Sequence, residues 1–287
     1  MAVLDVRLGR QLVKRLPMVS SRSLELWVPA SFLLLLVAAC FLGPALVHLP
    51  GPHSGSLDAA NEGIGSPGHL LGTDALGNDL LSQCLYGGRV SIAVGLGAVG
   101  LGVLVGGSLG VVAGVYGQWV DPVIMRILDT ALAFPALILA LAIAAYLGPN
   151  ERDEIIAIAF FTVPAFGRIA RGAVLRLVDR EFVLSARISG ASRLDILVRH
   201  IIPNVAPTIF TFAIVTVAVA MIVEAALSFL GLGIRPPEPS WGNLIENGQQ
   251  YLATEPHIVL VPSVFLFVMV LLLNLVGDAL RSRWEVD

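Results

Sequence analysis

Six long apolar runs constrain this 287-residue chain more than any other feature. They lie at about residues 27–49, 90–116, 127–147, 154–169, 206–231 and 258–280. Most approach the roughly 20 residues that a helix needs to cross a bilayer. Only 14% of the residues are charged, whereas a soluble domain is nearer one quarter charged. The sequence therefore predicts an all-α integral membrane protein with six transmembrane helices and no room for a large soluble domain.

The first apolar run follows a basic segment, residues 1–25. This run is too long for the core of a signal peptide, and it ends in Pro44, His48 and Pro50 rather than at a small-residue cleavage site. We therefore expect a retained first helix. Residues 26–287 then form one six-span domain.

Positive charge predicts the orientation of the spans. Six spans place both termini on the same side of the membrane. All but three of the 18 Lys and Arg residues fall on that side, the exceptions being Arg89, Arg152 and Arg235. Because Lys and Arg accumulate in cytoplasmic loops, we expect both termini and the segment 176–204 to be cytosolic. The loop 50–88 is then external.

The second half of that external loop regains a helical pattern. Leu76, Leu80, Leu81 and Leu85 recur at helical spacing, which predicts a short amphipathic helix at the outer interface.

Small residues and prolines mark the spans themselves. Gly102, Gly106, Gly110 and Gly114 follow one another at four-residue intervals, so that a neighbouring helix can approach closely. The neighbour is either another helix of this chain or a second subunit. Pro135 and Pro164 lie inside later runs and predict kinks.

Residues for catalysis or metal binding are missing from the sequence. Lys14 is the single lysine, and GRQLVKRL around it is not a phosphate-binding loop. The sequence has no HExxH motif and no Cys/His spacing for zinc. Cys40 and Cys84 do not suggest a disulfide framework. We expect no catalytic residue, no metal site and no cofactor bound by this chain.

Glu224 is a carboxylate well inside an apolar run. An intramembrane carboxylate is a functional hypothesis by default. It either handles a proton or substrate, or it is a structural group bonded to a neighbouring helix.

The segment 176–204 is polar and Arg-rich between two apolar runs. It predicts two short helices with a bend at Gly190, the second starting at a capping box made by Ser192 and Asp195. The expected apolar side of the second helix is Leu194, Ile196, Leu197 and Ile201, and the expected polar side is Arg193, Arg199 and His200. Pro203 and Pro207 should stop this helix before the fifth span. An ordinary basic loop that fixes topology would show the same charge.

The spacing Leu184-Ser-Ala-x3-Gly190-x9-His200-Ile-Ile-Pro203 resembles the EAA loop of bacterial ABC importer permeases. Leu184 and Ser185 replace the Glu-Ala of that motif. The resemblance implies a cytosolic coupling helix that contacts separate ATPase subunits. The residues it implicates are Ala186, Gly190, Ala191, Ser192, Asp195, Arg199, His200 and Pro203.

Four further segments resemble the C-type permease subunits of dipeptide, oligopeptide and nickel importers. They are HLLGTDALGNDLLSQCLYGGRVSIAVGL from His69, YGQWVDPVIMRILDTALAFP from Tyr116, EAALSFLGLGIRPPEPSWGNLI from Glu224, and the closing NLVGDALRSRWEVD. The resemblance implies a type I ABC importer permease fold in the bacterial cytoplasmic membrane, in contact with membrane lipid. It also favours a structural role for Glu224.

The same resemblance implies a set of partners. These are a homologous B-type permease, one or two ABC ATPase subunits that hold ATP and Mg²⁺, and an extracytoplasmic substrate-binding protein, with no nucleic acid. Docking of the binding protein is expected at Pro236, Pro237, Ser240 and Trp241. Peptides are the expected substrate; nickel or another small solute is the alternative. A secondary transporter that works alone and a membrane scaffold are the remaining hypotheses.

Overall fold

The computed structural model describes residues 19–235 and 237–284, and the expected cytosolic segment 1–25 therefore lies largely outside the described residues. In the described ranges every named element is helical. The longer elements are α2 (Val19–Leu46), α3 (Leu80–Leu101), α4 (Ser108–Tyr116), α5 (Val120–Leu132), α6 (Ala136–Leu147), α7 (Glu151–Leu175), α8 (Glu181–Ile188), α10 (Ile202–Phe229), α11 (Trp241–Gly248) and α12 (His257–Trp284). The short elements are η2 (Leu57–Ala59), the π-helical turns η3 (Gly102–Gly107) and η4 (Leu197–Ile201), α9 (Arg193–Ile196) and η5 (Gln249–Tyr251).

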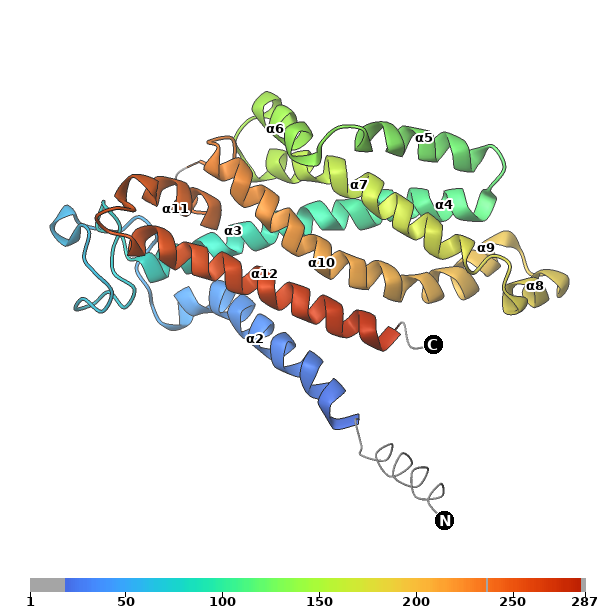
Figure 1. The fold of residues 1–287 in the computed structure, drawn as a ribbon, viewed down its shortest axis with the longest axis horizontal. Coiled ribbons are helices and arrows are strands. Elements are labelled where there is room, and N and C mark those ends of the chain that lie inside the picture. Colours follow the sequence, from blue (N-terminus) through green and yellow to red (C-terminus); the bar gives the residue numbers. More distant parts are fainter. Residues whose placement is uncertain (1–18, 236, 285–287) are drawn as a thin grey trace, which may run out of the picture.

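The molecule is an elongated helical bundle with two distinct ends (Figure 1). The helices α3, α4, α7, α10 and α12 run along its long axis, and α8 and α9 form one end. The residues 50–79 and α11 form the opposite end. We refer to these as the α8 end and the α11 end. The expectation of an all-α membrane protein is confirmed.

Five of the helical stretches are long and apolar enough to cross a membrane, and the bent pair α5–α6 makes a possible sixth. The run expected as one span at 127–147 is this pair, whose two helices meet at 82°. Pro135 lies at the break and caps α6. Because Pro lacks an N–H and disfavours a helical conformation in the residue before it, the helix ends there rather than kinks.

The expected amphipathic helix of the outer loop does not form. Leu80, Leu81 and Leu85 belong to the first turns of α3, which continues through η3 and α4 to Tyr116. Asp79 caps α3 by accepting a hydrogen bond from the amide of Ser82 at 2.8 Å. The helix therefore starts inside the stretch predicted as loop, and Leu76 lies in the preceding turn.

The glycines at four-residue intervals serve packing within the chain. A methyl group added at Gly106 would overlap the carbonyl group of Val163, and one added at Gly110 would overlap the carbonyl oxygen of Gly167. Both carbonyl groups belong to α7. The first of the two expected neighbours, a helix of the same chain, is thus confirmed.

We predict that Gly106→Ala separates α7 from the helix that contains η3. The added methyl group meets backbone that cannot rotate away, and overpacking of this kind costs about 1–3 kcal/mol. Thermal unfolding of the purified protein measures the loss. The matched control is Gly107→Ala, because a methyl group there meets no atom within 4 Å. Equal stability of both variants would contradict the close contact.

Candidate functional site

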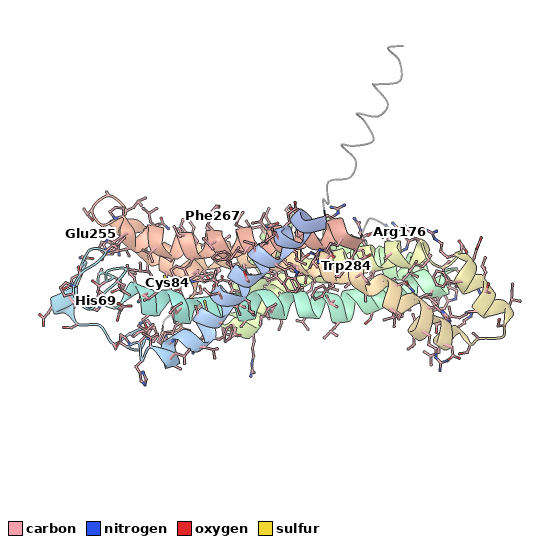
Figure 2. All side chains as sticks on the ribbon, turned by 90° about the horizontal axis from the view of Figure 1, so that it is seen from below. His69, Cys84, Arg176, Glu255, Phe267 and Trp284 are labelled. Atoms are coloured by element: carbon pink, nitrogen blue, oxygen red, sulfur yellow. The ribbon has the colours of Figure 1, made fainter. Side chains whose placement is uncertain are left out.

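The segment 176–204 forms the α8 end of the bundle. It leaves α7 at Leu175, turns through α8, bends, and returns through α9. Figure 2 shows Arg176 toward this end and His69 and Glu255 at the other. Gly190 lies at the bend with φ of +86°, a backbone conformation that residues other than Gly rarely adopt. The first short helix, the bend at Gly190 and the start of a second helix after the bend are confirmed.

The second helix begins at the expected cap. The Ser192 hydroxyl accepts a hydrogen bond from the Asp195 amide at 3.1 Å and donates one to the Asp195 carboxylate at 2.5 Å. Arg199 lies 3.9 Å from the same carboxylate. These bonds satisfy groups that the start of a helix leaves without partners.

Pro203 and Pro207 do not stop this helix, which corrects the expectation from the sequence. The helix from Arg193 continues through η4 and α10 to Phe229. The π-helical turn before Pro203 uses bonds between residues five apart, which accommodates a residue without an N–H. The side-chain amide of Asn204 also donates to the carbonyl oxygen of His200 at 2.7 Å.

A small apolar core holds the segment in place. Val183 of α8, Ile196 of α9 and Ile201 of η4 are buried against Val174 of α7 and Val205 of α10. Ala186 and Ala191 are half-buried against the same core. The segment is therefore a packed extension of the bundle rather than a flexible connection.

Large apolar side chains are also exposed on the outer surface of the segment. Ile188 is 88% exposed, Leu194 is 68% exposed and Val198 is 52% exposed. The expected apolar side of the second helix is thus divided, since Ile196 and Ile201 face the core and Leu194 faces outward. We call Ile188, Leu194 and Val198 the outer patch.

The other residues that the EAA-like spacing implicates in ATPase contact lie close to the outer patch in the sequence. Gly190, Ser192, Arg199 and Pro203 are exposed, and His200 is half-buried with its ring 6.3 Å from that of Phe182. The structure therefore brings the implicated residues to one end of the molecule.

Two ion pairs near this end were not foreseen from the sequence. Arg171 of α7 donates to both oxygens of Asp121 on α5 at 2.5 and 2.6 Å. Arg168 donates twice to Asp129 at 2.7 and 2.9 Å. The partners are 50 and 39 residues apart in the sequence, so no helical spacing could have paired them. They tie α5 to α7.

At the α11 end the structure corrects the expectation that Ser240 and Trp241 contact the binding protein. Ser240 and Trp241 are fully buried. The Ser240 side chain caps α11, and the Trp241 indole donates to the carbonyl oxygen of Cys84 at 2.8 Å. The Trp241 side chain thus holds α11 against α3, and the Ser240 hydroxyl lies 3.4 Å from that of Ser228 on α10. Neither buried side chain is available to a protein docked outside. Pro237 is exposed, and Pro236 lies outside the described residues.

Glu224 lies in a network of serine hydroxyls. Its carboxylate accepts from Ser91 on α3 at 2.8 Å and from Ser228 one turn later at 3.1 Å. The Ser91 oxygen in turn accepts from the amide of Trp241 at 3.2 Å. Glu224 thus joins α10, α3 and α11, which is the arrangement of a structural group.

Glu154 is a second buried carboxylate that sequence reasoning missed. It lies in the first turn of α7 and is 1% exposed. Neither carboxylate oxygen has a hydrogen-bond partner within the described parts of the chain. Its position at the start of an apolar run suggested a boundary residue, and only the packing of α7 buries it.

Comparison with known proteins gives one family. The model of the "Binding-protein-dependent transport system inner membrane component" family matches residues 106–285. The chain is similar to the "Glutathione transport system permease protein GsiD" of Pectobacterium atrosepticum, with 40% identity over 88% of this chain and 84% of the relative. It is also similar to the "Dipeptide transport system permease protein DppC" of Alkalihalophilus pseudofirmus, with 40% identity over 76% of this chain and 71% of the relative.

A solved structure shares the fold. A chain of the inward-facing MetNI methionine ABC transporter superposes with a TM-score of 0.58 and 18% identity, over 70% of this chain and 95% of that one.

We predict that Glu224→Gln preserves stability while Glu224→Leu lowers it. Gln retains an oxygen that accepts from a serine, whereas Leu leaves the hydroxyls of Ser91 and Ser228 buried without that acceptor. An unpaired buried polar group costs about 1–3 kcal/mol. Thermal unfolding of the two variants measures the difference. A stable Glu224→Gln protein that no longer transports would contradict the structural role.

Proposed function

We propose that this chain forms half of the path of a peptide importer, since it belongs to the family of binding-protein-dependent transport system inner membrane components. The other half would come from a homologous B-type permease. ATP and Mg²⁺ would be held by separate ABC ATPase subunits, and an extracytoplasmic binding protein would deliver the substrate. This chain would itself carry no ATPase activity.

The proposed orientation places the α8 end in the cytosol of a bacterium. The basic residues of the segment 176–204 support it, because Lys and Arg mark cytoplasmic loops. The segment carries Arg176, Arg180, Arg187, Arg193 and Arg199. The α11 end would then face outward, where the binding protein docks.

The outer patch is the observation that carries the ATPase-coupling proposal. Ile188, Leu194 and Val198 are each more than half exposed, whereas Val183, Ile196 and Ile201 of the same segment are buried in its own core. Exposed apolar patches on an ordered scaffold mark interaction sites. We propose that an ATPase subunit covers the outer patch, with Gly190, Ser192 and Arg199 around it.

Coupling follows from the continuity of the helix. Because α9, η4 and α10 form one helix from Arg193 to Phe229, a movement of the bound ATPase at α9 passes directly into α10. The core residues Val174 and Val183 pass the same movement into α7. Rigid-body rocking of this kind would open the path outward on ATP binding and inward after hydrolysis.

Peptides are the proposed substrate class. The support is the names of the two relatives, one a glutathione and one a dipeptide transport permease. Glutathione is a modified tripeptide, so both names agree on a short peptide. Nickel or another small solute remains the second candidate, on the resemblance of the motifs to nickel importers.

The exposed residues at the α11 end replace the buried ones as the proposed docking surface. Pro237 and Glu238 stand exposed just before the cap of α11. The His53 ring contacts the Pro237 carbonyl oxygen, which brings the loop 50–79 beside them. We propose that the binding protein contacts these two segments together.

We predict that Leu194→Glu weakens association with the ATPase subunits by at least about ten-fold, since a charge in the centre of an apolar interface must be desolvated. Copurification of the ATPase with the tagged permease measures the loss. The matched control is Ile64→Glu, which places the same charge at an exposed apolar site, 64% exposed, at the α11 end. Equal recovery of the ATPase with both variants would contradict the proposal.

Gly190 gives a second test of coupling. Its φ of +86° disfavours any residue with a Cβ, but Asn tolerates this region far better than Val. No atom lies within 4 Å of an added methyl group. We predict that Gly190→Val, strained by about 1–3 kcal/mol, reduces transport per ATP hydrolysed, while Gly190→Asn largely retains it. Equal activity of Gly190→Val and the parent would rule out a role for the bend.

A further inference from the structure

A cavity of about 290 Å³ lies at the α8 end, between the end of α4 and the segment 176–204. Val115, Val178 and Ile201 give it an apolar wall, and Arg187 and Arg193 line it with positive charge. Tyr116 also lines the cavity, and the Arg193 guanidinium lies 6.0 Å from the centre of the Tyr116 ring. The lining therefore combines two cations with a hydrocarbon surface.

Neither arginine has an anionic partner within the described residues. No ion pair joins Arg187 or Arg193 to a carboxylate in those ranges. Asp195 is the acidic residue nearest to Arg193 in the sequence, and it bonds to Ser192 and faces Arg199 instead. The two guanidinium groups can therefore accept an anion from outside the chain.

The position of the cavity indicates the source of that anion. Tyr116 ends the apolar helix α4, and Trp119 follows it, exposed, before α5 begins. Exposed Tyr and Trp at the ends of apolar helices sit at the level of lipid headgroups. An occupant at this level can place its charged group on the arginines and its hydrocarbon against the apolar wall.

We propose that this cavity binds the phosphate of an anionic phospholipid from the cytosolic leaflet. Guanidinium groups match phosphate oxygens with paired N–H donors, and basic pockets between helices on the cytosolic side suit such headgroups. The glycerol and first methylene groups lie against Val115, Val178 and Ile201. The placement in that leaflet rests on the orientation given under the proposed function.

Such a lipid would also act on the proposed coupling segment. Arg187 belongs to α8 and Arg193 to α9, on either side of Gly190. One phosphate that holds both arginines bridges the bend and ties it to the end of α4. Anionic lipid would therefore stiffen the segment that the ATPase contacts.

The test measures phosphatidylglycerol binding by the whole transporter with native mass spectrometry in detergent. Phosphatidylcholine, which is zwitterionic and has no net charge, is the comparison lipid. We expect the double variant R187Q/R193Q to bind phosphatidylglycerol about 10- to 30-fold more weakly, at roughly five-fold for each basic residue. The matched control R176Q/R180Q removes the same charge from exposed positions of the same segment that do not line the cavity. It should bind like the parent.

Three results would overturn the inference. One is equal phosphatidylglycerol affinity in the parent and both double variants. Another is an equal loss of phosphatidylglycerol affinity in both double variants, which would indicate non-specific electrostatic attraction of the lipid to the segment. The third is that R187Q/R193Q binds lipid like the parent but no longer binds the ATPase subunit. This result would indicate that the two arginines pair with carboxylates of the ATPase.

Competition with inorganic phosphate distinguishes a site for a lipid headgroup from a site for free phosphate. We expect millimolar phosphate not to displace the lipid, because free phosphate gains nothing from the apolar wall. Complete displacement would identify a site for free phosphate and overturn the lipid assignment. The experiment measures lipid binding rather than transport. The lipid proposal can therefore be wrong while the coupling proposal is right, and the coupling proposal can be wrong while the lipid proposal is right.

Discussion

The backbone contact between α7 and the helix formed by α3, η3 and α4 is the interaction on which the rest of the structure depends. Gly106 and Gly110 bring the two helices so close that a single methyl group would overlap the carbonyl groups of Val163 and Gly167. Apolar side chains gain little from association within lipid, so close packing must supply the attraction. Thr162 adds a hydrogen bond from its hydroxyl to the carbonyl oxygen of Ala98 at 2.8 Å.

The position of the segment 176–204 follows from that contact. The end of α7 carries Val174 into the core that also buries Val183, Ile196 and Ile201. The ion pair between Arg171 and Asp121 fixes α5 to the same helix. A segment held in this way presents the outer patch in one orientation. In the proposed coupling, such a segment would pass a movement of the ATPase into α10.

Local signals in the sequence predicted local structure well. The bend at Gly190 and the cap at Ser192 depend on the conformation of a few neighbouring residues, and both were foreseen. The fate of Pro203 was not, because a π-helical turn upstream accommodates the missing N–H. Pro135 breaks its run into two helices at 82°, whereas Pro164 lies inside the continuous helix α7. The residue type alone does not distinguish these outcomes.

Features that depend on distant contacts could not be foreseen from one sequence. Ser240 and Trp241 lie in a motif that suggested an exposed docking loop, yet α3 buries both. Glu154 was placed at the edge of a span, and the packing of α7 removes it from water. The family motifs nevertheless identified the fold, because the spacing of many residues along the chain is more specific than any single one.

Labelling of Ile188→Cys with a membrane-impermeant maleimide tests most directly whether the α8 end lies in the cytosol and is covered by the ATPase. The native Cys40 and Cys84 are buried, so their background is low. We expect no labelling in intact cells, labelling in inverted vesicles without the ATPase subunits, and protection when those subunits are bound. Labelling in intact cells, or equal labelling of inverted vesicles with and without the ATPase, would contradict this expectation.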